Sequence, residues 1–130
     1  MLNGISPQEA ERMELKKELE LEKKKCIPCS VDMPPMEKKR VQDYLKKVHG
    51  WESIRGKQIR RSFKFKDFKE TMGFVNKIAG IAEEQGHHPD IYIFYNEAEV
   101  TLWTHKIKGL HENDFIMAAK IDNIKTDGLK

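Results

Sequence analysis

Three of the five histidines fall around one predicted hairpin. His87 and His88 come just before its first strand, and His105 lies at the end of its second strand. In an antiparallel pair, facing residues lie equally far from the turn, so a turn centred on Asn96, or between Asn96 and Glu97, places His105 opposite His87 or His88. Facing side chains are about 4.5 to 5.5 Å apart at Cβ. The spacing predicts that at least two imidazoles meet at the open end of the hairpin.

Two carboxylates are predicted to lie within reach of these imidazoles. Glu83 comes one helical turn before His87, and Asp114 lies in the first turn of the last predicted helix. An imidazole, with an ordinary pKa of about 6.5, acts as an acid or a base at neutral pH, and a carboxylate beside it fixes its orientation and tautomer. These residue types in this arrangement predict acid–base catalysis.

Two other interpretations of the histidines stay open from the residues alone. The His-His-Pro segment could cap the preceding helix, whose C-terminal end favours cationic side chains. The three histidines, with Glu83 or Asp114, also have the ligand types of a metal site. Neighbouring residues of a strand point to opposite faces, so His87 and His88 bind one metal only where the chain is irregular.

The two cysteines form a Cys-Ile-Pro-Cys motif at residues 26–29. This spacing occurs in redox motifs and in half of a zinc site. A complete zinc site needs four ligands, and no second pair of this type follows. We interpret Cys26 and Cys29 as part of a turn held by Pro28. The alternative is metal binding by the pair together with His49 or a residue of another subunit.

Length and charge exclude several classes of protein. A chain of 130 residues and 15.2 kDa predicts one core-forming domain. Its 24 basic and 21 acidic residues give a net charge of only +3, which argues against an obligate nucleic-acid binder. No stretch approaches the ~18 uncharged residues of a spanning helix, and the N-terminus lacks the pattern of a secretory signal. We therefore expect a cytoplasmic protein with neither a membrane nor a nucleic-acid partner.

The apolar pattern predicts an α+β domain in the order helix, hairpin, helix, hairpin, helix. Helical and alternating spacings give these ranges: a helix over 36–49, strands over 51–54 and 58–65, a helix over 67–86, strands over 88–95 and 99–105, and a helix from 112 to 124. Consecutive hairpins do not build a parallel sheet. The expected fold therefore has two layers, a four-stranded antiparallel sheet with helices packed on one face.

Local signals predict where the helices begin and end. Asp67 and Glu70 have the spacing of a capping box, and Gly50 and Gly86 are predicted to stop the first and second helices. The second helix is expected to bury an apolar stripe of Phe68, Met72, Val75, Ile78, Ala79 and Ala82.

The N-terminal part is expected to lie outside this domain. Ser6 and Pro7 are typical of a helix start, and the charged sequence over 9–25 has too few apolar residues to join the core. Residues 26–35 are rich in proline and predicted to be a linker. We therefore divide the chain into an extension over 1–32, a domain over 33–125 and a tail over 126–130.

One set of spacings resembles the pterin-4a-carbinolamine dehydratase family, the 4a-hydroxytetrahydrobiopterin dehydratases. The matching residues are Glu83, His87-His88-Pro89, Tyr95, His105 and Asp114. The resemblance extends from about Met33 through Trp51, Phe63 to Phe68 and Gly73-Phe74 to the last helix. The Cys-Ile-Pro-Cys motif also resembles bacterial members, whereas the charged stretch over 6–25 is outside the shared core.

The resemblance implies a fold, a reaction and roles for the matching residues. The implied fold is the one expected above, assembled as a homodimer or homotetramer. The reaction removes water from the 4a-hydroxytetrahydropterin that aromatic amino-acid hydroxylases leave, and gives the quinonoid dihydropterin without a metal or nucleotide cofactor. His87 and His105 are implied as the acid–base pair. His88 is implied at the catalytic site chiefly to hold the pterin, with Glu83 and Asp114 in the substrate-binding polar shell.

The chain departs from the family pattern at three places. Asp90-Ile91 follows the histidines where some members have an aromatic residue, and Trp103 stands where a small residue is common. His111 replaces a serine before the last helix, and histidine is a poor N-cap, so a weak helix start is expected. A second interpretation comes from animal relatives that double as dimerisation cofactors of a transcription factor: a non-catalytic binding module.

Overall fold

The computed structural model describes Gln8, residues 21–28 and residues 33–124. The predicted helix start at Ser6, Cys29 and the tail over 126–130 lie outside the described residues. The described elements are η1 (Leu21–Lys23), α2 (Lys38–Leu45), β1 (Glu52–Ile54), β2 (Gln58–Lys64), α3 (Phe68–Gln85), β3 (Asp90–Phe94), β4 (Glu97–Leu102), η2 (His105–Ile107) and α4 (Glu112–Asp122). From α2 onward they confirm the predicted order of helices and hairpins. None of the described helices is long and apolar enough to cross a membrane.

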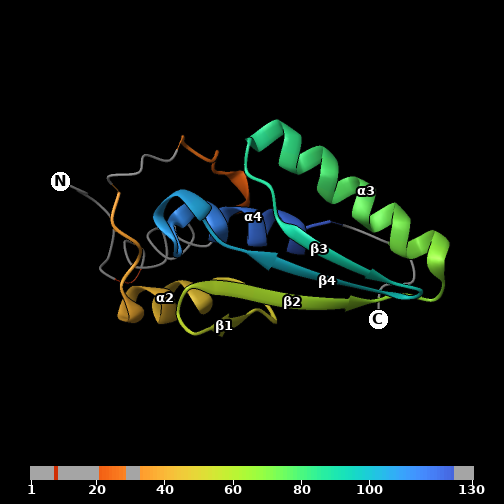
Figure 1. The fold of residues 1–130 in the computed structure, drawn as a ribbon, viewed down its shortest axis with the longest axis horizontal. Coiled ribbons are helices and arrows are strands. Elements are labelled where there is room, and N and C mark those ends of the chain that lie inside the picture. The colour runs from red at the N-terminus through yellow and green to blue at the C-terminus, as the bar shows by residue number, and fades with distance from the viewer. Residues whose placement is uncertain (1–7, 9–20, 29–32, 125–130) are drawn as a thin grey trace.

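The four strands form one antiparallel sheet in the order β1-β2-β4-β3. In its centre, Ile59 lies opposite Leu102 and Phe63 opposite Ala98, and all four side chains are buried. Their face of the sheet packs against α3 and α4 (Figure 1). The predicted two-layer α+β fold is therefore confirmed.

The second hairpin has a different register from the predicted one. Phe94 pairs with Glu97, so the turn consists of Tyr95 and Asn96 and is centred earlier than expected. β3 begins only after Pro89, which has no N–H for the ladder, and β4 ends at Leu102. The predicted placement of His105 opposite His87 or His88 within the ladder is therefore wrong.

The ends of α3 agree with the sequence signals, and its predicted buried stripe is confirmed for Val75, Ile78 and Ala82 but not for the other residues. The Asp67 carboxylate accepts a hydrogen bond from the Glu70 N–H at 2.9 Å, and Gly86 closes the helix with a φ of +66°. Phe68 is exposed instead of buried, whereas Phe74 is buried between Phe63 and Phe65 with ring centroids 4.6 and 5.0 Å away. This aromatic cluster rotates the buried stripe to Thr71, Phe74, Val75, Ile78 and Ala82.

The N-terminal half differs from its prediction at two places. α2 stops at Leu45, and Gly50, with a φ of +75°, makes the later turn that leads into Trp51. Leu21 in η1 is only 1% exposed and belongs to the hydrophobic core beside α4. The prediction that the charged stretch over 9–25 stays out of the core is therefore wrong for Leu21.

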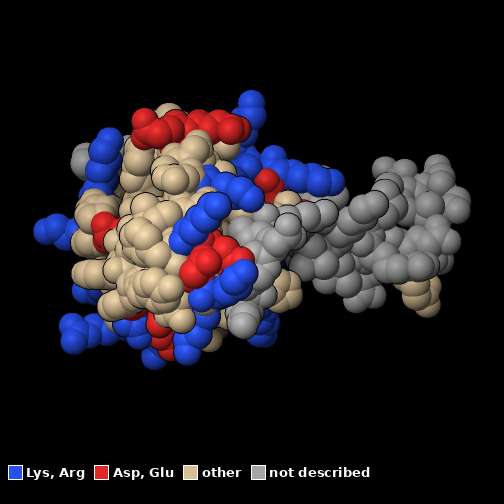
Figure 2. Space-filling model, turned by 90° about the vertical axis from the view of Figure 1, so that its right-hand side faces the viewer, with Lys and Arg blue, Asp and Glu red and all other residues tan. Residues whose placement is uncertain are grey.

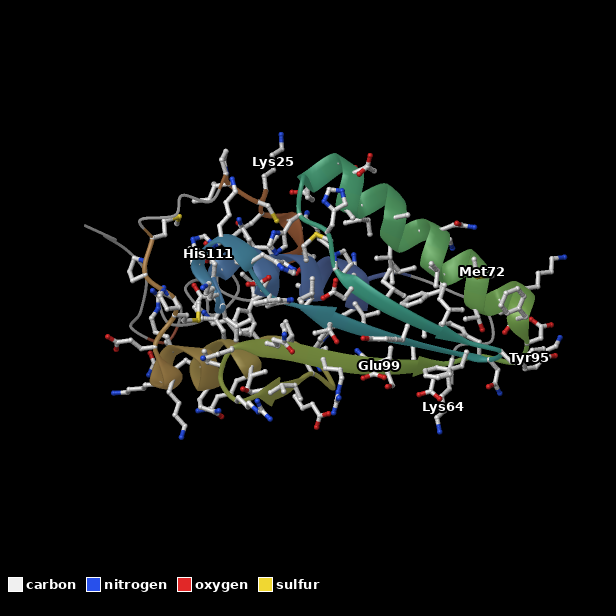
Figure 3. The ribbon with its side chains drawn as sticks, viewed as in Figure 1. Lys25, Lys64, Met72, Tyr95, Glu99 and His111 are labelled. Carbon is white, nitrogen blue, oxygen red and sulfur yellow. The ribbon has the colours of Figure 1, made fainter. Side chains whose placement is uncertain are left out.

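An uncharged area marks the end of the molecule that carries the β3–β4 turn. Figure 2 shows this area with lysine, arginine and acidic side chains around it, and Figure 3 places Tyr95 and Met72 at the same end. β3 is an edge strand of the sheet. The exposed large apolar side chains of this region are Phe68, Tyr92, Ile93, Phe94 and Tyr95.

Candidate functional site

The three predicted histidines line one open cavity of about 610 Å³. Its walls come from residues 26–28, 85–90 and 103–106, together with Asn113. His87 and His88 stand in the connection between α3 and β3, and His105 begins η2. Convergence of the imidazoles therefore comes from the two segments beyond the open end of the hairpin and not from facing ladder positions.

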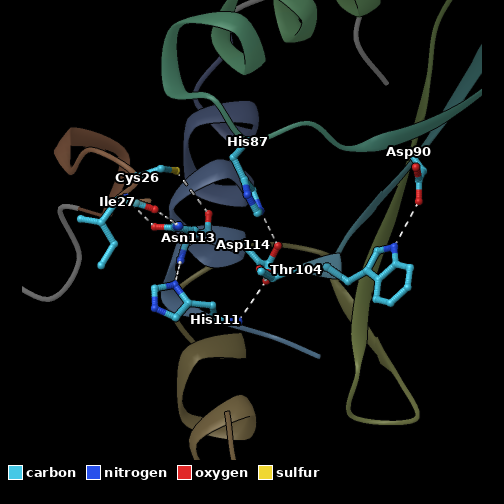
Figure 4. Close-up of polar contacts among 9 residues, drawn as sticks. Cys26, Ile27, His87, Asp90, Thr104, His111, Asn113 and Asp114 are labelled. Carbon is cyan, nitrogen blue, oxygen red and sulfur yellow. Dashed lines mark hydrogen bonds and ion pairs between the residues drawn. The ribbon is translucent and has the colours of Figure 1, made fainter. Parts of the chain in front are cut away.

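His87 is held by a buried carboxylate. Its Nε2 lies 2.6 Å from Oδ1 of Asp114, whose residue is 0% exposed (Figure 4). The second oxygen, Oδ2, accepts hydrogen bonds from the Thr104 hydroxyl at 2.8 Å and the His111 N–H at 3.0 Å. The carboxylate thus has three donors, which compensates its burial and fixes the ring of His87.

His88 has a carboxylate partner of a different kind. Its Nε2 lies 2.5 Å from Oε2 of Glu83, but the two side chains are 60% and 77% exposed. Glu83 does not line the cavity. Water screens such a pair, so it contributes little to stability. Glu83 therefore reaches the site only through His88, whereas Asp114 supports His87 from the interior.

His105 lies against the indole of Trp103. Their ring centroids are 4.0 Å apart, and the Trp103 Nε1–H donates a hydrogen bond to Oδ2 of Asp90 at 3.3 Å. Both Trp103 and Asp90 line the cavity. Two of the departures from the family pattern therefore contact each other and build one wall of this cavity.

The first turn of α4 is capped reciprocally. Nδ1 of His111 accepts a hydrogen bond from the Asn113 N–H at 3.1 Å, while the His111 N–H donates to Asp114. The expectation that His111 weakens this helix start is therefore wrong, because Nδ1 of its imidazole accepts the main-chain hydrogen bond that a serine hydroxyl would accept at this position. The same cap fixes the position of Asp114.

Residues 26–28, which we call the strap, contribute a wall of the cavity that the sequence did not predict. The Cys26 N–H donates to Oε1 of Gln85 at 2.9 Å. The side-chain amide of Asn113 accepts from the Ile27 N–H at 3.0 Å and donates to the Ile27 carbonyl at 2.6 Å (Figure 4). The predicted linker is therefore docked over these residues. Its proline content was the only signal, and it does not indicate a docking site.

Ion pairs connect other parts of the chain to the ends of α4. Burial alone would raise the pKa of Glu112, but hydrogen bonds from the Tyr44 hydroxyl at 2.9 Å and the Lys24 ammonium at 3.1 Å hold it below its ordinary value. At the other end, burial raises the pKa of Asp122 although Arg61 lies 2.6 Å away. Both carboxylates lie outside the cavity.

The described residues contain no group of three or more histidine, cysteine, aspartate and glutamate side chains placed to hold a metal ion. The side chain of His87 contacts Asp114, and the His87 N–H donates to the Ala82 carbonyl at 3.3 Å, so His87 takes part in the cap of α3 through its main chain only. Because Cys29 is outside the described residues, the turn that we predict for the cysteine pair stays a prediction, and metal binding by the pair stays its alternative.

Comparison with known proteins identifies the family. The sequence profile described as pterin 4 alpha carbinolamine dehydratase matches residues 34–124. The chain belongs to this family. The matched range of this pterin carbinolamine dehydratase family member includes the candidate site residues His87, His88, His105, Glu83 and Asp114. The strap lies before the matched range.

Relatives and a solved structure agree with the family. Two proteins described as candidate pterin-4-alpha-carbinolamine dehydratases are similar over most of their length. The one from Rubrobacter xylanophilus is 44% identical over 105 residues, 81% of this chain and 98% of the relative. The one from Aromatoleum aromaticum is 49% identical over 106 residues, 81% and 95% of the two chains. A crystal structure of a transcriptional coactivator/pterin dehydratase from Brucella melitensis superposes with a TM-score of 0.64 at 39% identity, over 67% of this chain and 94% of that one.

Proposed function

We propose that the chain is a hydro-lyase that converts a 4a-hydroxytetrahydropterin, a pterin-4a-carbinolamine, to the quinonoid dihydropterin and water. The observation that carries this proposal is the convergence of His87, His88 and His105 on one cavity in a member of the dehydratase family. Imidazoles are the side chains best suited to exchange protons near neutral pH.

The reaction needs two proton transfers and no change of oxidation state. The bond between C4a and the hydroxyl oxygen breaks, and this oxygen leaves as water after it receives a proton. The N5–H bond gives up its proton, and its electron pair forms the double bond between N5 and C4a. One acid and one base, each within hydrogen-bond reach of its atom, are sufficient for this chemistry.

The proposed roles follow the contacts of each histidine. His87 and His105 share the two proton transfers. Asp114 holds Nε2 of His87 and so leaves Nδ1 as the ring nitrogen for the substrate, while it stabilises the imidazolium that forms when His87 accepts a proton. His88 binds the pterin, oriented by Glu83. Glu83 and Asp114, which were predicted in the substrate-binding shell, do not line the cavity, and we propose that each acts on the substrate through the histidine that it holds.

The proposed reaction places the protein in cofactor recycling. A 4a-hydroxytetrahydropterin is the form left by an aromatic amino-acid hydroxylase, and reduction of the dihydropterin product restores the tetrahydropterin. We propose that the chain acts in the cytoplasm on tetrahydrobiopterin or a related pterin.

A direct assay of dehydration tests the proposed function. The full chain is added to a chemically generated 4a-hydroxytetrahydropterin, and the decay of its absorbance is compared with spontaneous decay in buffer. We expect the wild-type chain to accelerate the decay and the folded His87→Ala/His88→Ala/His105→Ala variant not to do so. The similar Brucella protein is described as a transcriptional coactivator as well as a pterin dehydratase. No acceleration by micromolar wild-type protein would contradict the enzyme and favour a binding module.

We also propose that the chain forms the homodimer or homotetramer expected from the family. The exposed apolar side chains of β3 support this, because an edge strand with unpaired main-chain groups and apolar side chains readily pairs with another strand. In a twofold-symmetric dimer, the β3 strand of a second copy would offer the complementary main-chain N–H and C=O groups and apolar side chains.

Mass measurement in solution tests the assembly. We expect light scattering of the wild-type chain to give two or four times 15.2 kDa. Phe94→Glu places a charge on the edge strand and is expected to shift the mass toward the monomer. Ser62→Glu is the matched control, because Ser62 is exposed on the inner strand β2. A monomeric wild-type chain would contradict the proposal, as would equal effects of the two substitutions.

A further inference from the structure

The strap lines the same cavity as the residues proposed to move protons. Its three residues, Cys26, Ile27 and Pro28, have no charged side chain, whereas the other lining segments carry the histidines, Asp90 and Lys106. The strap also precedes the residues that the family profile matches. This wall of the cavity is therefore formed by residues outside the matched profile.

Contacts upstream of the strap and within it fix where it runs. Upstream, Leu21 is buried in the core, and the Lys120 ammonium donates to the Glu22 carbonyl at 2.7 Å. Lys24 pairs with Glu112 at 3.1 Å. Within the strap, Gln85 and Asn113 bind the main chain of Cys26 and Ile27. Residues 21–28 are thus held along α4 up to the cavity.

The first turn of α4 sets the spacing between the strap and His87. Asn113, only 1% exposed, uses both ends of its side-chain amide on Ile27, and the next residue, Asp114, holds His87. Because the two neighbours belong to one capped helical turn, the strap and the imidazole keep a defined separation.

A cavity lined by both a nonpolar segment and polar groups suits a flat bicyclic ring. Ligand sites bind such rings between apolar surface, which is covered on binding, and a few polar groups that set orientation. We propose that the strap is an apolar wall of the pterin site and determines substrate affinity, with Gln85 and Asn113, which also line the cavity, as the residues that hold it in position. This inference rests on the proposed dehydratase function.

Separate measurement of binding and turnover tests the strap. Gln85→Ala removes the acceptor of the Cys26 N–H, and Ile27→Pro removes the N–H that Asn113 binds. In the full chain, each is expected to raise KM, and the Kd of a 7,8-dihydropterin, by about 5- to 10-fold with kcat within about twofold. Because both substitutions act on one segment, the fold-increase in KM and Kd of the double variant is expected to be smaller than the product of the two single increases.

Gln58→Ala at the start of β2, outside the cavity, is the matched control and should keep the wild-type KM. Gln85 is only partly buried, so its variant should fold where an Asn113 variant would lose buried contacts. Wild-type KM and Kd values in both strap variants of an active protein would overturn the strap inference and leave the proposed function intact. A wild-type chain that neither dehydrates the carbinolamine nor binds the dihydropterin would overturn both.

Discussion

His105→Ala and His87→Ala should each lower kcat for carbinolamine dehydration by about 10²- to 10³-fold, the contribution of a positioned acid or base. Each substitution removes a group proposed to carry one proton and leaves the other walls of the cavity in place. The dissociation constant of a 7,8-dihydropterin should change much less than kcat, because proton transfer contributes to the transition state and not to ground-state binding. Turnover by stopped-flow absorbance and binding by fluorescence separate the two effects.

His49→Ala is the matched control for these variants, because its exposed imidazole lies outside the cavity. It should keep wild-type kcat and KM. Wild-type turnover in both His87→Ala and His105→Ala would show that neither imidazole moves a proton, and the acid–base assignment would then be wrong.

Asp114→Ala should reduce both stability and turnover. The change removes a buried acceptor from His87, the Thr104 hydroxyl and the His111 N–H. Because buried donors without an acceptor are costly, we expect the free energy of unfolding to fall by about 2–4 kcal/mol. The imidazole of His87 also loses its fixed orientation, so kcat should fall at least about 10-fold even at temperatures where the variant is folded. Denaturant unfolding and turnover at low temperature measure these two effects.

Asp122→Ala separates loss of stability from loss of the site. Its carboxylate accepts from Arg61 and the Trp51 Nε1–H at 2.6 and 2.8 Å near the far end of α4, away from the cavity. We expect this variant to be destabilised too, but with wild-type kcat once folded. If the Asp114 variant kept full turnover, or if the two variants lost kcat equally, the specific role of Asp114 in holding His87 would be contradicted.

The parts of the fold that could be predicted depend on short-range patterns. Asp67 and Gly86 act within one helical turn, so their residue types alone indicate where α3 begins and ends. The alternation of Phe63 and Phe65 likewise places both on the buried face of the sheet. The rotation of α3 toward Phe74 was missed because it depends on packing against these rings, which helical spacing does not report.

The sequence predicted which histidines share the candidate site, but not which part of the backbone brings them to it. Spacing indicated that His105 comes near His87 and His88, and they do share a cavity, although the ladder ends before any of them. The Thr104 N–H donates to the Gly109 carbonyl at 2.8 Å and so closes the loop that contains η2. Such a loop has no periodic pattern of apolar residues by which the sequence could predict it. The strap was missed because its bonds to Asn113 join residues 86 positions apart.

The strap is attached to the domain through its main chain, since the Cys26 N–H and the Ile27 N–H and carbonyl make the bonds to Gln85 and Asn113. Every amino acid except proline offers these same groups, so mutation can exchange the side chains at 26–28 while the attachment persists. Evolutionary drift there could retune which pterins an enzyme of this architecture accepts, without disturbing the imidazoles that would do the chemistry.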